Sequence, residues 1–257
     1  ASLRSQLDSF CILELGAGSG ELAVQLLRRL AVLDSLPEEY LILEISADLM
    51  DRQQVKLAAE IPDFIDRVRW VAQLPEDFCG IVIANDATQF SAGVNLNYFY
   101  EKAVNKQFKD IDLFLINFQQ SLYQLQHANF PVISCPSGLA IGGGYEVISQ
   151  TSFIAAHSNS VLGLVESLVG LIPAGGGCKE MLRRWANHSD IKNDPKLLSL
   201  KVFNLIGYAT TADSPIKAKA QQFLGEQDIM VMSKDRLIEE ADNLIFLNKE
   251  SYQSLDS

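Results

Sequence analysis

The sequence has 257 residues, of which 48% are hydrophobic and 21% are charged, and its formal net charge at pH 7 is −11. This composition is typical of a soluble globular protein with a packed core, and it excludes a disordered chain. An acidic protein repels polyanions, so DNA and RNA are not expected as partners.

The sequence also predicts the cellular compartment of the protein. Four cysteines lie far apart, form no C-x-x-C pair and have apolar neighbours, so we expect buried free thiols and a reducing compartment; they are Cys11, Cys79, Cys135 and Cys178. The histidines lack metal-site spacing, and no metal is predicted. No signal peptide or stretch of roughly 20 apolar residues occurs, which predicts a cytoplasmic protein without a membrane partner. The first residue, Ala1, indicates a processed, truncated or engineered start.

Short apolar runs alternate with helical patterns in residues 10–86. Strands are predicted at 10–16, 40–46, 68–73 and 80–86, with helices at 20–33 and 47–61 between them. Such alternation is typical of a parallel sheet with helical crossovers. This part is therefore predicted to be half of a doubly wound, Rossmann-like unit.

The rest of the chain has a different pattern. One long helical region is expected over 96–128, followed by a buried strand at 131–136, a glycine-rich loop at 137–144 and a helix from 145. Strand and loop follow to residue 177, then a helix at 178–186. The polar stretch 187–200 resembles a linker, and helices are predicted at 201–209, 214–224 and 234–248, with a short strand or turn at 225–233.

The segment "LELGAGSGEL" places Gly16, Gly18 and Gly20 between a predicted strand and helix. Glycines allow a backbone to turn tightly and to approach a ligand, and the helix start offers free N–H groups to a nucleotide-like cofactor. Tight strand-to-helix packing alone also requires glycine, so this signal is weak. Glu44 ends the next strand, where a carboxylate can accept hydrogen bonds from the two hydroxyls of a ribose.

Residues 10–86 resemble the cofactor half of class I S-adenosylmethionine-dependent methyltransferases, in particular the MidA-like family. The resemblance rests on "ILELGAGSGELA", "LPEEYLILEISADLMDRQQ" and "LPEDFCGIVIAN". It implies that the glycine loop holds the methionine part of S-adenosylmethionine and that Glu44 holds its ribose. The segments that shape the methyl-acceptor site in that family are absent after Asn85.

A second group of candidate residues lies in "PSGLAIGGGYE" and "GLVESLVGLIPAGGG", which contain Glu146 and Glu166. A carboxylate in an apolar run is costly unless it is paired or used. Taken singly, Glu146 can be a charge that complements a helix dipole, and Glu166 a hydrogen-bonded buried acid. As a pair beside glycine loops, they favour acid–base chemistry.

Residues 80–250 resemble the crotonase superfamily, most closely the hydratase part of bacterial fatty-acid-oxidation proteins that also carry 3-hydroxyacyl-CoA dehydrogenase. "FSAGVNL" and "GLAIGGGYE" are similar to its two oxyanion loops. The resemblance implies that the backbone N–H groups of Ala92 and Gly143 bind the oxygen of a coenzyme A thioester. It also implies that Glu146 activates water and that Glu166 protonates the α carbon, which is the hydration of a 2-enoyl-CoA.

Two departures leave alternatives open. Ala174 stands where the superfamily often has glycine, and the methyltransferase-like half replaces the usual opening strands and helix. Besides an enoyl-CoA hydratase of fatty-acid β-oxidation, the chain is therefore interpreted as a MidA-like methyltransferase or as a catalytically inactive hybrid. Crotonase-type enzymes commonly form trimers, so the resemblance also implies a homo-oligomer with a small acyl-CoA substrate.

The predicted fold class is α/β, with an N-terminal Rossmann-like half joined to a crotonase-like core and C-terminal helices. The predicted domains are residues 1–85, 86–187 and 188–257. The stretch "GIVIANDATQFSAG", residues 80–93, contains both a strand similar to the fourth strand of a methyltransferase and the first oxyanion loop. The junction between the two patterns is expected within it.

Overall fold

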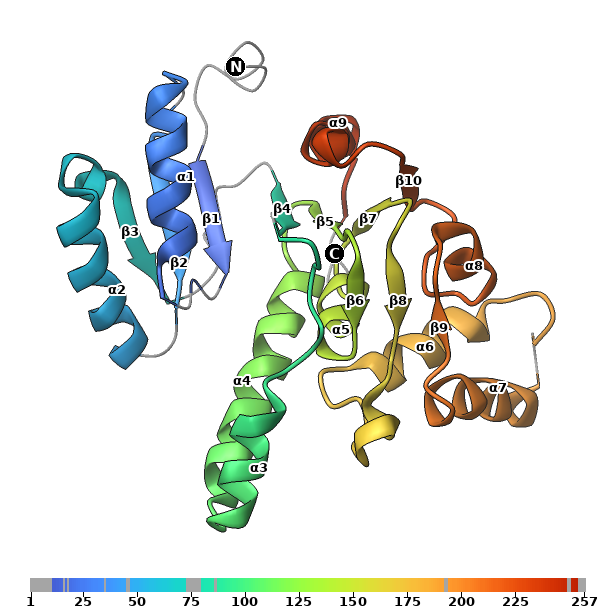
Figure 1. The fold of residues 1–257 in the computed structure, drawn as a ribbon. Helices are drawn as coiled ribbons and strands as arrows, with labels where there is room; N and C mark the ends of the chain where they lie inside the picture. The colour runs from blue at the N-terminus through green and yellow to red at the C-terminus, as the bar shows by residue number, and fades with distance from the viewer. Residues whose placement is uncertain are drawn as a thin grey trace. The chain divides into compact units, whose positions relative to one another are not determined.

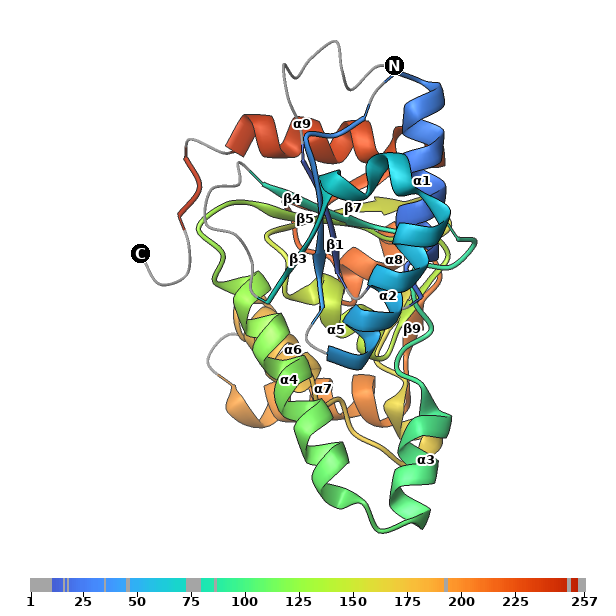
Figure 2. The ribbon, with the colours of Figure 1, turned by 90° about the vertical axis from the view of Figure 1, so that its left-hand side faces the viewer.

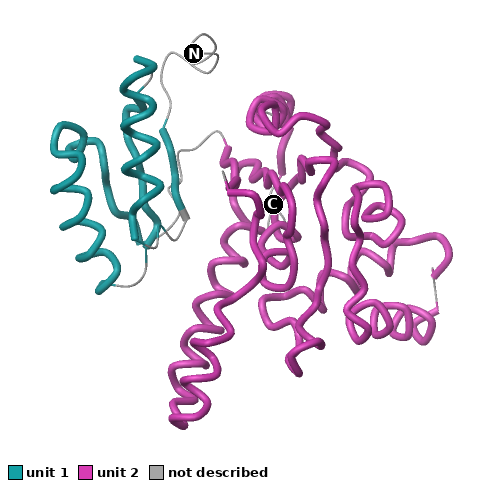
Figure 3. Tube along the Cα trace, viewed as in Figure 1, with its two compact units in different colours: residues 1–77 teal, residues 78–257 magenta. Residues whose placement is uncertain are grey.

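The computed structural model describes residues 11–15, 17, 19–34, 36–44, 47–72, 80–85, 87–191, 194–248 and 251–253. The chain divides into two compact units, residues 1–77 and residues 78–257, drawn in different colours in Figure 3. Each unit has its own sheet and its own hydrophobic core. Within the described residues, no helix is long and apolar enough to cross a membrane.

The first unit is a parallel three-stranded sheet with helical crossovers (Figure 1). Its strand order is β1-β2-β3, and its elements are β1 (Cys11–Leu15), α1 (Glu21–Val32), β2 (Glu39–Leu43), α2 (Ala47–Glu60), η1 (Pro62–Arg67) and β3 (Val68–Val71). The apolar faces of the helices bury Leu27 and Leu57 against Tyr40 and Ile42 of the sheet. The predicted alternation of strand and helix is therefore confirmed for this half.

The second unit contains a parallel sheet of order β10-β7-β5-β4. It consists of β4 (Ile81–Ala84), β5 (Val132–Cys135), β7 (Phe153–His157) and β10 (Ile229–Val231). Ile81 pairs with Val132 and Ala84 with Cys135, so the strand that resembles a fourth methyltransferase strand lies in this sheet. The apolar side of α9 (Leu237–Asn248) packs against β4, β5 and β7, as Figures 1 and 2 show.

A second, smaller sheet of order β6-β8-β9 lies in the same unit. Its strands are β6 (Leu139–Ile141), β8 (Val161–Gly163) and β9 (Thr211–Ala212), and β8 pairs with β9 in the antiparallel sense. The remaining elements are α5 (Gly143–Ser149), η2 (Glu166–Val169), α6 (Gly177–Ala186), α7 (Pro195–Gly207), α8 (Pro215–Ala220) and η3 (Lys234–Arg236). The short helix α5 comes directly after β6.

The helical region expected as one piece over 96–128 is two helices, α3 (Leu96–Val104) and α4 (Phe108–Gln126). The chain reverses between them because Lys106 adopts a left-handed conformation with φ +56°. The reversal lets the Phe99 ring meet the Phe114 ring edge to face at 5.1 Å. Burial of aromatic surface between the two helices thus accounts for the break.

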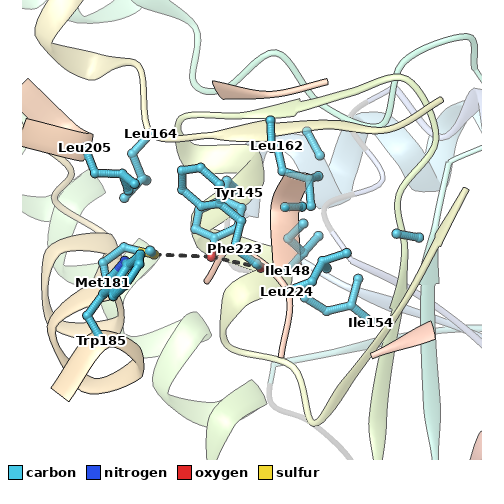
Figure 4. Close-up of a cluster of buried hydrophobic side chains, with 14 of the residues drawn as sticks. Tyr145, Ile148, Ile154, Leu162, Leu164, Met181, Trp185, Leu205, Phe223 and Leu224 are labelled. Carbon is cyan, nitrogen blue, oxygen red and sulfur yellow. Dashed lines mark hydrogen bonds between the residues drawn. The ribbon is translucent and has the colours of Figure 1, made fainter. Parts of the chain in front are cut away.

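The main core of the second unit surrounds α5 (Figure 4). The hydroxyl of Tyr145 donates to the carbonyl oxygen of Phe223 at 3.1 Å and lies 3.4 Å from the sulfur of Met181. All three side chains are fully buried. This packing fixes the orientation of α5, which carries Glu146 on another side.

Two further expectations were wrong in part. Cys11 is exposed and Cys178 is half-buried, because Cys11 begins a strand and Cys178 lies in the first turn of α6; only Cys135 is buried, and Cys79 lies outside the described residues. The linker-like stretch 187–200 contains the start of α7. Asp194 caps that helix by accepting from the N–H of Leu197, and Pro195 is its first residue.

Candidate active site

The loop after β4 is fixed to β6 by backbone pairing. The N–H of Ser91 donates to the carbonyl oxygen of Leu139 at 2.8 Å, and the N–H of Ile141 donates to that of Ser91 at 3.1 Å. This pairing places Ala92 and Gly93 beside the start of α5. A Cβ on Gly93, whose φ is +97°, would lie only 3.6 Å from the nitrogen of Gly143.

The predicted oxyanion donors lie in these two adjoining loops. The neighbouring N–H groups have acceptors, since Gly142 donates to the carbonyl oxygen of Gly163 at 2.9 Å and Gly93 to Oγ of Ser91 at 3.2 Å. For the N–H groups of Ala92 and Gly143, no acceptor is found in the described part of the chain. The structure thus brings together two backbone donors that the fold itself does not use.

Glu146 lies in the first turn of α5 and is 3% exposed. Its Oε1 accepts two backbone hydrogen bonds, from Gly175 at 2.8 Å and from Gly177 at 2.9 Å. Burial raises its pKa to about 7, with a smaller contribution from the charge of Glu166, although the hydrogen bonds act in the opposite direction. A carboxyl with such a pKa can accept a proton near neutral pH.

Glu166 is the first residue of η2, and both of its carboxyl oxygens are buried. No other side chain bonds either oxygen among the described residues, but the backbone N–H groups of Val165 and Glu166 lie close enough to favour the ionised form. A Cβ on Gly142 would lie 3.4 Å from Oε1 of Glu166 and 3.9 Å from Cα of Gly93, so the acid lies next to the oxyanion loops. Burial raises the pKa of Glu166, which favours a protonated carboxyl that can donate.

The wall beside Glu146 consists of α4 and the loop before α6. A Cβ on Gly175 would overlap the ring of Phe118 and lie 2.8 Å from both Oε2 of Glu146 and Cδ1 of Leu122. The Phe118 ring is also near Gly143, since a Cβ there would lie 3.7 Å from its Cζ. The ring of Phe118 is therefore near both the proposed oxyanion donor Gly143 and the loop that bonds Glu146.

The sequence interpretation did not single out Phe118, Gly175 or Gly177. The run "PAGGG" was the available signal for the two glycines, because consecutive glycines let a backbone approach a carboxylate closely. Cys178 comes next in α6, and its pKa is raised by burial and by the charges of Glu146 and Glu166. Phe118 has no such signal, since helix α4 contains apolar residues on several faces.

The first unit contains the other predicted site. Gly16 and Gly18 lie outside the described residues, whereas Gly20 forms a turn with φ +76°, in which its N–H donates to the carbonyl oxygen of Ala17 at 2.8 Å. A Cβ on Gly20 would lie 2.6 Å from Cδ1 of Leu57, so glycine is required there. Glu44 comes directly after β2 and is 6% exposed.

A buried amide holds the carboxylate of Glu44. Nε2 of Gln53 donates to Oε2 of Glu44 at 3.1 Å, and Nε1 of Trp70 donates to Oε1 of Gln53 at 2.9 Å. A buried acid at the carboxyl end of a parallel strand, beside a glycine turn, suits the ribose of an adenosyl ligand. The described residues of this unit therefore fit S-adenosylmethionine.

Family models match both parts of the chain. Residues 2–88 match a family described as "Putative S-adenosyl-L-methionine-dependent methyltransferase", and residues 66–193 match "Enoyl-CoA hydratase/isomerase". The two matches overlap between residues 66 and 88, which includes β4. Both resemblances predicted from the motifs are thus confirmed.

Two curated relatives match 65% and 40% of the chain. A "Probable 3-hydroxyacyl-CoA dehydrogenase" of Bacillus subtilis is 33% identical over 168 residues, which are 65% of this chain and 21% of the relative. The "2,3-dehydroadipyl-CoA hydratase" of Escherichia coli is 32% identical over 102 residues, 40% of this chain and 38% of that enzyme. The chain therefore spans about a fifth of the first relative and well under half of the second.

A solved structure gives the fold. The enoyl-CoA hydratase from Polaromonas sp. JS666 superposes with a TM-score of 0.55 at 21% identity, covering 69% of this chain and 62% of that protein. The predicted α/β fold class is therefore confirmed, with parallel sheets in both units. The chain has the crotonase fold, and its sequence resembles the enoyl-CoA hydratase/isomerase family over residues 66–193 and a methyltransferase family over residues 2–88.

Proposed function

We propose that the second unit hydrates a 2-enoyl-CoA thioester to a 3-hydroxyacyl-CoA. One observation carries this proposal: the buried carboxyl of Glu166 lies beside the two glycine loops, whose N–H groups at Ala92 and Gly143 have no acceptor among the described residues. Gly143 is buried, and a buried N–H group without an acceptor costs free energy unless a ligand uses it. The family match to enoyl-CoA hydratase/isomerase supports the same chemistry.

The thioester oxygen accepts from the N–H groups of Ala92 and Gly143, which stabilise the enolate that forms in the transition state. Glu146 takes a proton from water, and the hydroxide oxygen bonds to the β carbon. Glu166 gives its proton to the α carbon, so the carbon–carbon double bond becomes single and the elements of water are added. Transfer of a proton from Glu146 to Glu166 through solvent restores both acids.

The two glutamates have environments that suit these different tasks. Oε1 of Glu146 accepts from Gly175 and Gly177, and these bonds stabilise the ionised form that a base requires. For Glu166, burial outweighs the backbone N–H groups of Val165 and Glu166 and raises the pKa, which favours the protonated form that an acid requires. A relative from Rickettsia felis that is 31% identical over 170 residues is named "Putative fatty acid oxidation complex trifunctional enzyme", which supports fatty-acid oxidation as the setting and an acyl-CoA as substrate.

The test is the loss of the conjugated enoyl-thioester absorbance of crotonyl-CoA with the full chain. Glu146→Gln and Glu166→Gln should each lower the rate by about 10²–10⁴-fold, whereas Glu226→Gln, a change at an exposed residue, should leave it unaltered. Failure of the parent to consume the substrate would overturn the proposal and favour an inactive hybrid chain. An active parent whose rate is unchanged in both active-site variants would overturn the roles proposed for the two glutamates.

A second candidate function is the binding of S-adenosylmethionine by the first unit. It is supported by the glycine turn at Gly20, by the buried carboxylate of Glu44 and by the match of residues 2–88 to a methyltransferase family. The bound group would supply an electrophilic methyl, while Glu44 would hold its ribose. Calorimetry with S-adenosylmethionine should show binding that Glu44→Ala abolishes and that the exposed change Asp63→Ala leaves intact. Absence of binding by the parent would exclude this function.

A further inference from the structure

The side chain of Gln53 is fully buried, although glutamine is usually exposed. Its amide lies between two polar partners from different elements, Trp70 in β3 and Glu44 after β2. Both partners bond to it within 3.1 Å. A buried amide that is bonded at both ends specifies one arrangement of its neighbours.

The chemistry of Trp70 determines which end of the amide faces Glu44. An indole N–H can only donate, so the group of Gln53 that faces Trp70 must be the carbonyl oxygen Oε1. The NH₂ group is then directed at Oε2 of Glu44, where it donates to the carboxylate. Trp70 thus prevents the amide flip that would place two acceptors against each other.

The same side chain also lies beside the glycine turn. A Cβ added at Gly20 would lie 3.6 Å from Cγ and 3.8 Å from Cβ of Gln53, so the methylene part of Gln53 borders the space next to Gly20 while its amide bonds Glu44. Gln53 therefore lies near both parts of the site that are described.

We propose that Gln53, oriented by Trp70, is a positioning residue that holds the carboxylate of Glu44 where it binds the ribose diol of an adenosyl ligand. This inference rests on the proposed binding of S-adenosylmethionine and deepens it. Gln53 acts through Glu44 and needs no contact with the ligand. Its removal should therefore weaken recognition of the ribose more than it disturbs the fold.

The change Gln53→Glu tests the donor directly because the two side chains have almost the same shape. The new carboxylate can still accept from Trp70, but it presents an oxygen to Glu44 instead of an NH₂ group. At high pH the two carboxylates repel and Glu44 is displaced. At low pH the pair takes up one proton, and the protonated oxygen donates in place of the lost amide. Binding should therefore recover as the pH falls.

Other ionisable groups in the surrounding elements are the same in the parent and the variant. The hydroxyl of Tyr40 donates to Glu14 at 2.9 Å, and burial raises the pKa of Glu14. Lys56 in α2 forms an ion pair with Glu21 in α1 at 2.5 Å. These groups and the amine of the ligand change the affinity of the parent and of the variant in the same way. The affinity of the parent at each pH is therefore the reference.

The experiment is calorimetric titration of the full chain with S-adenosylhomocysteine between about pH 5.5 and about pH 8. Gln53→Glu should bind roughly 10- to 100-fold more weakly than the parent at the upper pH, and the difference should shrink at the lower pH. Gln53→Met keeps the volume of the side chain, but methionine has no group that a proton could turn into a donor. This variant should therefore bind more weakly than the parent by the same factor at the upper and the lower pH. Gln25→Glu, which places a carboxylate against Glu21 at an exposed site, should match the parent.

The outcomes separate the two proposals. A parent that does not bind S-adenosylhomocysteine would overturn both the adenosyl site and the role of Gln53. A parent that binds, together with a Gln53→Glu deficit that is equal at both pH values, would leave the adenosyl site intact and overturn the positioning role alone. Circular dichroism of each variant at both pH values distinguishes lost binding from lost folding.

Discussion

Oε1 of Glu146 lies 2.8 Å from the backbone nitrogen of Gly175, and this hydrogen bond joins α5 to the loop before α6. The carboxylate that we propose as the base is therefore also a structural link within the second unit. Gly175 can approach so closely because it has no Cβ. Stability and activity are coupled at this contact, and single substitutions around it can separate them.

The stability of Glu146→Gln relative to the parent should depend on pH. Because burial raises the pKa of Glu146 from 4.5 to about 7, the folded protein binds its proton more tightly than the unfolded chain does. The contribution of this group to the free energy of unfolding is complete below about pH 4.5 and is lost as the pH rises to about 7. The variant is neutral throughout, so it should gain roughly 1–3 kcal/mol on the parent between about pH 5 and about pH 8.

Urea unfolding at a series of pH values measures this gain. Glu226→Gln, at an exposed position, provides the baseline and should track the parent at every pH. A difference between Glu146→Gln and the parent that stays constant across the series would show that the fold does not perturb this carboxyl.

Gly142→Ala should impair both folding and catalysis, whereas Gly170→Ala should impair folding alone. Both glycines have left-handed backbones, with φ +56° and φ +74°, so alanine should cost about 1–2 kcal/mol at each. A Cβ at Gly142 would lie 3.4 Å from Oε1 of Glu166, but one at Gly170 would meet nothing within 4 Å. The methyl group at Gly142 would occupy space beside the proposed acid, so the kcat for crotonyl-CoA of the folded fraction should fall in the first variant only. Equal values would show that the reaction does not use that space.

Gly175→Ala should destabilise the second unit by about 1–3 kcal/mol because the new methyl group overlaps the ring of Phe118. A second change, Phe118→Leu, makes room for the methyl group and should restore part of that loss. Thermal unfolding of the parent, the two single variants and the double variant gives the coupling free energy between residues 118 and 175. Strict additivity of the two changes would mean that the ring and the glycine do not touch.

Arg184→Met should destabilise the protein far more than Arg183→Met. Both guanidinium groups pair with Glu180, which is fully buried, but the side chain of Arg184 is 12% exposed and that of Arg183 is 57% exposed. Arg184 also donates to the carbonyl oxygens of Phe223 and Ser149. We expect losses of about 3–5 kcal/mol for Arg184 and about 0–1 kcal/mol for Arg183, measured by urea unfolding; similar losses would contradict this ranking.

Features that depend on local periodicity and on glycine could be predicted from the sequence. The alternation of strand and helix patterns in residues 10–73 predicted β1, α1, β2, α2 and β3, because the apolar pattern of each element lies within one short segment of sequence. The positions of Glu146 and Glu166 next to glycine loops could be read in the same way. Their separate roles and those of Ala92 and Gly143 remain predictions.

Relationships between distant residues could not be read from the sequence. Lys106 has no intrinsic preference for a left-handed backbone, and the reversal there is accompanied by contacts between the two helices: Phe99 packs on Phe114, and Lys102 pairs with Asp110. The bond of Trp70 to Gln53 joins residues 17 positions apart and depends on the pairing of β2 with β3. The apolar run at 81–84 fits either sheet, and its partner is decided by backbone pairing with β5.

The position of β4 at the end of the order β10-β7-β5-β4 has a consequence for how such a chain can arise. A strand at the edge of a sheet contributes one ladder, so exchanging the segment that supplies it leaves the inner ladders intact. Recombination before Gly80 can therefore attach a different leading module without dismantling the sheet of the second unit. The sheet of the second unit can therefore accept a different segment at that edge while its inner ladders, β10-β7 and β7-β5, are kept.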